Sequence, residues 1–318
     1  MSEFLITEAQ REQLIGCVAF TGPSGAGKTL GSLKVAKGMM DAKYGGDLTD
    51  SEKWKKIGVI DTEHSRSKIY ANTTGFGLEI HSFIHLDFTA PFSVDRLDKA
   101  VLALKSHGCE VIIIDSLSHF WEGDGGILDL QQKYGGNFQA WREVNPTYGK
   151  FISIVTGERH EVDILACMRA KQAYEVSENE VGKLKVEKLG LKPVQRDSLE
   201  YEFQIVFGID MDHNAFRLKD NSGAFNIPRK LETDVGEVIY NWLKTGVDVL
   251  AEERKEKEAI IQTIQGYAES NHDEMKEFVA NTIEAAEKRY GELINMPLNR
   301  LHDFVNAVHA QEVKLNKE

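Results

Sequence analysis

One segment near the N-terminus constrains the fold of this chain more than any other feature. It reads Gly22-Pro23-Ser24-Gly25-Ala26-Gly27-Lys28-Thr29 and fits the pattern GxxxxGK[ST]. An apolar run, Cys17–Phe20, directly precedes it, and a stretch with helical spacing, Lys28–Ala42, follows. Glycines let successive backbone N–H groups face one anion, and the start of a helix adds positive partial charge. The sequence therefore predicts a strand, a phosphate-binding loop and a helix in this order.

The side chains of this segment predict the ligand. Lys28 is expected to neutralise the β- and γ-phosphates of a nucleoside triphosphate, and the Thr29 hydroxyl is expected to ligate Mg²⁺. ATP and Mg²⁺ are therefore the expected cofactors. The residues expected to surround the phosphates are Gly22, Pro23, Ser24, Gly25, Ala26, Gly27, Lys28, Thr29 and Leu30.

Apolar runs alternate with helical patterns from about residue 16 to residue 245. This alternation predicts an α/β fold with a mostly parallel central sheet. The runs are continuously apolar, as in strands that are covered on both faces. Further strands are expected at Ile57–Ile60, Phe83–Leu86, Val111–Ile114, Val162–Cys167, Phe203–Ile209 and Ala215–Lys219, the last two as a hairpin, and helices at Val94–His107 and Glu232–Lys244.

The pattern changes after residue 246, where three amphipathic helices are expected to form a small all-α element. The first carries Ile260 and Ile264, the second Met275 to Tyr290, and the third Ile294 to Val308. We therefore expect two domains, an ATPase domain at 1–246 and a helical domain at 247–318. The net charge is −12, and a globally acidic chain binds nucleic acid only through a local basic patch.

Composition favours a cytoplasmic location. The three cysteines are Cys17, Cys109 and Cys167, an odd number without a CxxC pair, which favours buried, reduced thiols. The N-terminus lacks the basic and apolar regions of a signal peptide, and no run of eighteen apolar residues predicts a membrane span. The histidines have no zinc-site spacing, and no GxSxG or Cys–His pattern indicates a covalent nucleophile.

Two carboxylates follow apolar runs, at the strand ends where open α/β sheets place their ligands. Asp115 ends Val111–Ile114 and is expected to hold Mg²⁺, directly or through water. Glu63 follows Ile57–Ile60 in the segment IDTEHSR. Because Asp115 is followed by serine, Glu63 is the candidate for orienting or deprotonating the attacking water. The alternative for Glu63 is a solvated loop glutamate.

These segments resemble a known family. IDTEHSR is similar to the IDTEGxxR segment of RecA- and RadA-type recombinases, and IIIDSLSHF is similar to their Walker B strand. The resemblance extends over residues 16–227 and implies a RecA-like P-loop core in which Glu63 activates water. It also implies that the end of the strand at Val162–Cys167 senses the γ-phosphate, which those proteins do with glutamine. Here Arg169 or Lys171 is better placed and Gln172 lies further out, so this role stays open between them.

The same resemblance implies a homo-oligomer, a ring or a filament, in which a basic residue reaches the neighbouring subunit's ATP. Arg217-Leu218-Lys219-Asp220-Asn221 is similar to the hairpin that carries this residue in RecA-like proteins, although Asn221 stands where arginine is usual. Lys219 is therefore the expected trans-acting cation. The alternative is an ordinary surface lysine.

A basic segment follows the strand at Val162–Cys167. Residues 182–196 hold five basic side chains and one acidic one, and residues 173–189 are expected to form a hairpin with its turn near 180–182. By resemblance, this segment contacts single-stranded DNA. Phe138, Trp141 and Tyr174 have rings that can stack on bases, but packing is the role expected for them. The lysines expected at the phosphates are Lys183, Lys185, Lys188 and Lys192. The alternative is a solvated charged hairpin.

The segment from the phosphate loop to KxGLKPVQRDSLEYEF is most similar to phage-encoded RecA-like ATPases of the single-strand-annealing class. This resemblance implies a recombination ATPase in the bacterial cytoplasm that binds single-stranded DNA, promotes annealing or strand exchange and acts beside a single-strand-binding protein. Two alternatives are a nucleotide-gated ATPase that loads or regulates a partner, and a replication or packaging motor.

Overall fold

A computed structural model describes residues 8–178, 184–196, 198–226, 228–269 and 272–315, and of residues 172–178 and 184–191 it describes the backbone alone. The chain forms two compact units, one of Leu14–Lys244 and one that combines the described residues of 1–13 and 245–318. The sequence pattern alone placed the domain boundary after residue 246.

The larger unit is built on a central sheet with the strand order β3-β2-β4-β5-β1-β7-β8, with β6 paired to β5. The strands β3, β2, β4, β5, β1 and β7 are parallel to one another, whereas β8 runs antiparallel to β7 and β6 antiparallel to β5. The predicted α/β fold with a mostly parallel sheet is confirmed. The strands are β1 (Cys17–Gly22), β2 (Ile57–Asp61), β3 (Ile84–Asp87), β4 (Val111–Asp115), β5 (Asp163–Glu178), β6 (Leu184–Pro193), β7 (Ile205–Ile209) and β8 (Ala215–Asp220).

Helices cover both faces of the sheet, and successive strand residues enter opposite cores. Val111 and Ile113 pack with α1 (Lys28–Tyr44), α2 (Asp50–Trp54) and α7 (Thr233–Leu243). Ile112 and Ile114 enter the other core. This alternation explains why the strands read as continuous apolar runs. The helices of the second face are α3 (Val94–Ser106), α4 (His119–Glu122), α5 (Ile127–Lys133) and α6 (Trp141–Val155).

Close helix packing fixes the helix that follows the phosphate loop. A Cβ atom at Gly38 of α1 would lie 1.8 Å from the Thr233 carbonyl oxygen, and one at Gly236 of α7 would lie 2.0 Å from the Val35 carbonyl oxygen. Only glycine permits this approach of α1 and α7. The contact holds α1, and with it the loop at its N-terminus, firmly against the rest of the core.

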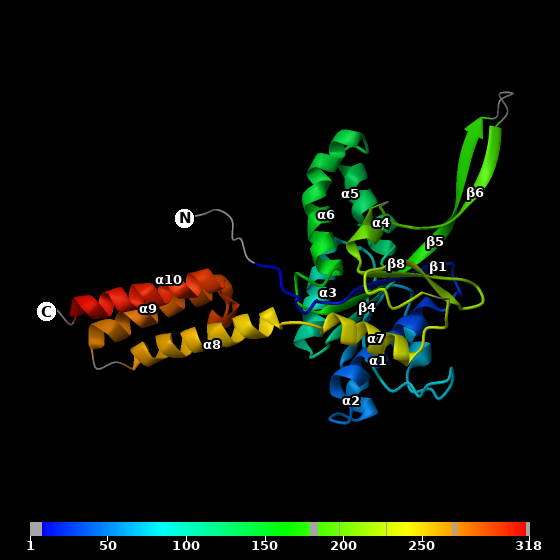
Figure 1. Cartoon of the computed structure of the whole chain (residues 1–318). Helices are drawn as coiled ribbons and strands as arrows, with labels where there is room; N and C mark the ends of the chain where they lie inside the picture. The colour runs from blue at the N-terminus through cyan, green and yellow to red at the C-terminus, as the bar shows by residue number, and fades with distance from the viewer. Residues whose placement is uncertain (1–7, 179–183, 197, 227, 270–271, 316–318) are drawn as a thin grey trace. The chain divides into compact units, whose positions relative to one another are not determined.

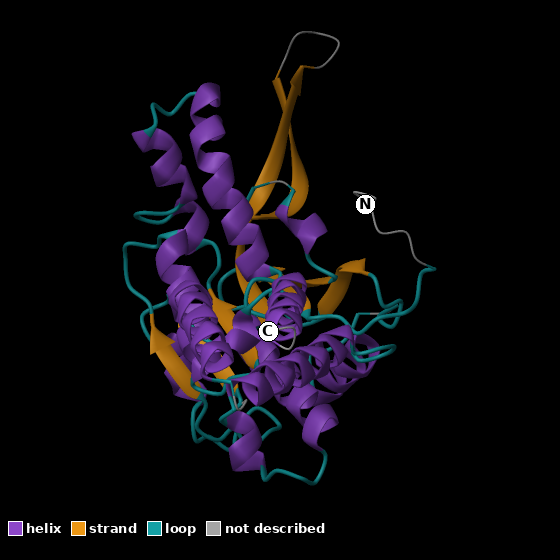
Figure 2. Ribbon diagram, turned by 90° about the vertical axis from the view of Figure 1, so that its left-hand side faces the viewer, coloured by secondary structure: helices purple, strands orange, loops and turns teal. Residues whose placement is uncertain are grey.

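Strand β5 is longer than the sequence pattern predicted. It pairs with β1 and β4 in the sheet and then continues into an antiparallel hairpin with β6, from Ala170↔Pro193 to Glu178↔Leu184. The hairpin extends beyond the surrounding helices (Figure 1 and Figure 2). The expected hairpin is confirmed, although its turn lies outside the described residues.

The smaller unit contains the three predicted helices, α8 (Val249–Ala268), α9 (Asp273–Tyr290) and α10 (Leu298–Leu315). Their core includes Ile264, Val279 and Phe304. Ile294, expected in the third helix, instead lies in a 3₁₀ turn, η4 (Leu293–Asn295). Pro297 explains the difference, because the residue before a proline is disfavoured in the α conformation.

Candidate functional site

Four strand ends bring the predicted site residues together at one edge of the sheet. In the register of the strands, Gly22 lies beside Arg169, and Asp61, Asp115 and Cys167 lie side by side. A cavity of about 490 Å³ opens at this edge, within the range of roughly 300–1,000 Å³ of small-molecule sites. The residues that line it are Ser24, Gly25, Ala26, Gly27, Lys28, Thr29, Leu30, Gly31, Lys34, Glu63, Arg66, Ile69, Tyr70, Phe76, Asp115, Arg169, Ile209, His213, Lys230, Leu231 and Glu232.

The loop between β1 and α1 presents unsatisfied backbone donors to this cavity. Gly25 and Gly27 have φ angles of 85° and 92°, a region that favours glycine. Among the described residues, the N–H groups of Gly25, Gly27, Lys28 and Thr29 donate to no protein acceptor. Orphan donors at a helix start bind anions, so the loop fits a phosphate group.

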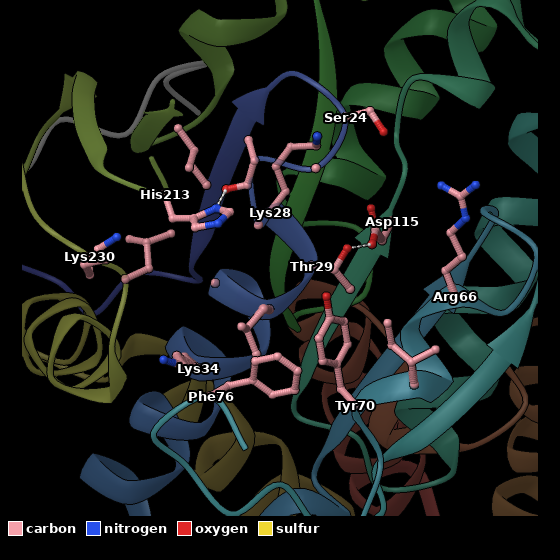
Figure 3. A pocket seen from close by; sticks show the side chains of 18 of the residues that line it. Ser24, Lys28, Thr29, Lys34, Arg66, Tyr70, Phe76, Asp115, His213 and Lys230 are labelled. Carbon is pink, nitrogen blue, oxygen red and sulfur yellow. Dashed lines mark hydrogen bonds between the residues drawn. The ribbon is translucent and has the colours of Figure 1, made fainter. Parts of the chain in front are cut away.

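Lys28 adds a positive charge that no carboxylate neutralises by direct contact. Its Nζ donates to the carbonyl oxygens of Gly22 at 2.9 Å and Pro23 at 2.8 Å. Lys34, one and a half turns further along α1, also lines the cavity, but it pairs with Glu232 at 2.6 Å. Figure 3 shows both lysines at the cavity. Of these two buried cations, Lys28 is therefore the one available to an anionic ligand.

Thr29 and Asp115 form a second pair within the cavity (Figure 3). The Thr29 hydroxyl donates to Asp115 Oδ2 at 2.5 Å. Burial raises the pKa of Asp115 to about 6, and the nearby Glu63 and Asp61 add to the rise while the Thr29 hydrogen bond opposes it. A buried carboxylate with a raised pKa gains from a cation beside it. Hydroxyl and carboxylate oxygens are ligands that suit Mg²⁺, so this pair fits the metal.

Glu63 is positioned by the turn that follows β2. Its backbone N–H donates to Asp61 Oδ1 at 2.8 Å, and the Ser67 N–H and hydroxyl donate to Asp61 Oδ2 at 2.8 and 2.6 Å. The Glu63 carboxylate turns toward β5, where both Nε and Nη2 of Arg169 lie 2.9 Å from Oε1. Arg66 is more distant, 3.6 Å from Oε2. The glutamate thus faces the cavity in a held position.

The structure brings together part of the predicted set. Glu63, Lys28, Thr29, Asp115 and Arg169 share the cavity with the loop residues 24–30, and Gly22 and Pro23 supply the carbonyl groups that hold Lys28.

Other predicted residues lie away from this cavity. Lys171 does not line it and pairs with Glu122 at 2.8 Å, and Lys219 donates to the Tyr201 carbonyl oxygen at 2.6 Å. Lys192 is exposed on β6. The side chains of Lys185 and Lys188 are not described, and Lys183 lies outside the described residues.

The cavity also contains residues to which the sequence analysis assigned no role. Arg66, Tyr70 and Phe76 come from the segment after β2, and their place behind a strand end was the one available signal. His213 reaches the loop from the β7–β8 turn, with Nδ1 3.0 Å from the Ala26 carbonyl oxygen. Lys230, Leu231 and Glu232 precede α7, and no local motif marks them.

Comparison with known proteins identifies one family. A family model described as an AAA domain matches residues 16–254, which is most of the chain. No curated protein matches the sequence. Among the helices of the described part of the chain, none combines the length and apolar character that a membrane crossing requires.

Proposed function

The chain belongs to the AAA domain family of P-loop ATPases, and from this premise we propose that it hydrolyses ATP with Mg²⁺ and couples hydrolysis to single-stranded DNA in recombination. One observation carries the ATPase part of the proposal. The orphan N–H groups of the loop and the uncompensated Lys28 stand directly beside the Thr29–Asp115 pair. A triphosphate and its metal require this combination of donors, charge and oxygen ligands.

The residues of the cavity divide the chemistry among them. The loop N–H groups and Lys28 hold the phosphates, while Thr29 and Asp115 hold Mg²⁺. The metal, when bound, neutralises charge that develops on the phosphoryl oxygens. Glu63 orients the attacking water and accepts its proton. Arg169 stabilises negative charge that develops on the transferred phosphoryl group.

The Glu63–Arg169 pair supports these two assignments and adds a condition. Each partner neutralises the other at 2.9 Å, so neither is fully available for its catalytic task while the contact persists. Glu63 accepts a proton from water only when its carboxylate is turned to that water. Hydrolysis therefore includes a step in which Arg169 shifts its donors from Glu63 toward the phosphate side of the cavity.

The DNA part of the proposal rests on the hairpin and on the resemblance to phage recombination ATPases. The strand that carries Arg169 continues into the hairpin with β6. A ligand that moves the hairpin can therefore move the backbone of Arg169 at the cavity. Lys183, Lys185, Lys188 and Lys192 supply positive charge for phosphates. The active form is a homo-oligomeric ring or filament in which Lys219 reaches a neighbouring subunit's nucleotide, and it works beside a single-strand-binding protein in the cytoplasm.

The test is ATP hydrolysis with and without single-stranded DNA, at low and high salt. We expect stimulation by DNA that fades with salt, because lysine–phosphate contacts release counterions. The double variant Lys185→Glu, Lys188→Glu should lose the stimulation. The matched control Lys276→Glu, Lys288→Glu, which makes the same charge change in α9, should retain it.

The outcomes separate the competing functions. Hydrolysis that is robust but indifferent to DNA would reject the recombination role and favour a partner-regulated ATPase or a motor. ATP binding without turnover would favour a nucleotide-gated loading protein. Normal hydrolysis by Lys28→Met would reject the assignment of the site itself.

A further inference from the structure

A second groove lies outside the nucleotide cavity, at the base of the β5–β6 hairpin. It is bordered by α4, by the 3₁₀ turn η2 (Phe138–Ala140), by the start of α6 and by the segment after β6. Figure 1 and Figure 2 show the α5–α6 pair and the hairpin extending from the same side of the sheet. The side chains that matter here are Trp121, Phe138, Trp141, Arg142, Gln195 and Arg196.

Aromatic rings form one wall of this groove. The Trp121 and Trp141 rings stack at 5.9 Å between centroids, with 17° between their planes. Phe138 is 90% exposed. Its turn is nevertheless well held, because Asn137 accepts a hydrogen bond from the Ala140 N–H at 3.0 Å and from Gln131 at 2.8 Å. An exposed ring on a held turn, beside two further rings, forms an apolar patch of the kind found at binding surfaces.

Positive charge flanks these rings without a direct acidic partner. The Arg196 guanidinium lies 5.0 Å from the Trp141 ring and 4.7 Å from the Tyr148 ring. Its one hydrogen bond is a long contact of 3.4 Å to Asn145. Among the described residues, neither Arg196 nor the exposed Arg142 forms an ion pair, although Glu143 also borders the groove. The two arginines are therefore available to an anion.

Gln195 supplies an independent sign of a ligand site. The residue is 7% exposed, and its Nε2 donates to the Leu117 carbonyl oxygen at 2.9 Å. Its Oε1 is buried and has no hydrogen-bond partner. A buried acceptor without a donor costs free energy, and the amine or ring N–H of a nucleobase is a donor of the required kind.

We infer that this groove binds an unpaired nucleobase of a single strand, stacked on Phe138 beside the Trp121–Trp141 pair, with its phosphates against Arg142 and Arg196. Aromatic faces combined with arginine are the means by which proteins hold single strands without sequence preference. The inference deepens the proposed function and rests on its DNA part. A docked peptide is the competing occupant, but aromatic rings, two free cations and an amide acceptor suit a base and its phosphates better than an apolar chain.

One backbone hydrogen bond links the groove to the nucleotide cavity. The Val194 N–H donates to the Arg169 carbonyl oxygen at 2.8 Å, and Gln195 and Arg196 are the next two residues. Gln195 and Arg196 are one and two residues from Val194, whose N–H contacts the Arg169 backbone. A base that moves either side chain can therefore shift the backbone that positions Arg169. Through this connection, bound single-stranded DNA can open the Glu63–Arg169 contact.

The experiment measures binding of a short oligothymidylate to the full chain by its tryptophan fluorescence, and repeats it with a strand of equal length that has abasic sites. Phe138→Ala should weaken oligothymidylate binding about tenfold. The matched control Tyr201→Ala, which removes another highly exposed aromatic ring, should bind like the wild type. The abasic strand should bind weakly to the wild type and equally to Phe138→Ala.

Each result decides the matter. If Phe138→Ala bound each strand as tightly as the wild type does, and the wild type did not distinguish the two strands, the groove assignment would be overturned. DNA binding by the hairpin would remain possible. If the wild type bound no strand, the DNA part of the proposed function would fail as well. Thermal unfolding of Phe138→Ala, measured in parallel, verifies that the variant is folded.

Discussion

Two buried lysines of α1 allow a direct test of which charge in the cavity receives the nucleotide. Lys28 has only carbonyl oxygens as hydrogen-bond partners, whereas Lys34 is paired with the Glu232 carboxylate. Lys28→Met removes an uncompensated charge. The double variant Lys34→Met, Glu232→Gln removes a matched pair of charges from the same cavity and leaves its net charge unchanged.

The expected magnitudes follow from these contacts. A hydrogen bond that involves a charged group contributes about 1.5–3 kcal/mol. When nucleotide binds, Lys28 exchanges two carbonyl contacts for phosphate oxygens. We therefore expect Lys28→Met to lose about 2 kcal/mol of binding free energy, which raises Kd about 30-fold. The Lys34–Glu232 pair is half exposed on the carboxylate side, so its removal should cost at most about 1 kcal/mol of stability and should leave affinity almost unchanged.

The assay is titration of each variant with a fluorescent ATP analogue in Mg²⁺ buffer, together with thermal unfolding without nucleotide. Lys28→Met should bind weakly, and its thermal unfolding gives the stability cost of the two lost carbonyl contacts separately. The double variant should bind like the wild type and unfold slightly earlier. Wild-type affinity in Lys28→Met, or equal losses in both variants, would refute the reasoning that Lys28 supplies the free charge.

Two further predictions concern catalysis and stability. Glu63→Gln should lower single-turnover hydrolysis by about 10²–10⁴-fold because the proton acceptor is lost, while ATP affinity changes little because the loop N–H groups, Lys28, Thr29 and Asp115 remain; unchanged hydrolysis would exclude Glu63 as the base. Although burial acts to raise it, hydrogen bonds from Arg159, Lys150 and a histidine hold the pKa of Asp98 well below its usual range. Asp98→Asn should therefore cost about 1 kcal/mol near neutral pH, more than the exposed control Asp95→Asn. Because the folded state binds this proton less readily than the unfolded state, the difference from wild type should shrink as pH falls below about 4; an equal deficit at low pH would contradict this account.

The sequence predicted the central sheet and the phosphate loop because both leave local signals. A strand covered on both faces must be apolar throughout, and the loop needs its glycines and Lys28 at fixed spacing. Glu63 and Asp115 were predicted because each directly follows such a strand. Their shared cavity then follows from the register of β2 and β4.

Other parts of the fold left weaker signals. Helix α6 includes Pro146, a residue that normally argues against a helix interior, and glycines interrupt the segment before it. The hairpin at 173–189 was predicted, but the polar stretch Arg169–Gln172 gave no sign that it is one continuous strand with Val162–Cys167. Lys230, Leu231 and His213 reach the cavity only through tertiary packing, which a single sequence does not encode in any short pattern.

Strand β5 continues from the sheet into the hairpin, with one irregularity of register at Ala173/Tyr174, and this has a mechanical consequence. A β-strand is already almost fully extended, at about 3.3 Å per residue, so it has little slack. Tension applied at the tip of the hairpin therefore cannot be absorbed by lengthening the chain between the tip and Arg169. It must either displace Arg169 or peel β5 from β1 and β4, and the interior pairing of β5 makes peeling the costlier response. Force on the β5–β6 hairpin is therefore expected to move Arg169 beside Glu63.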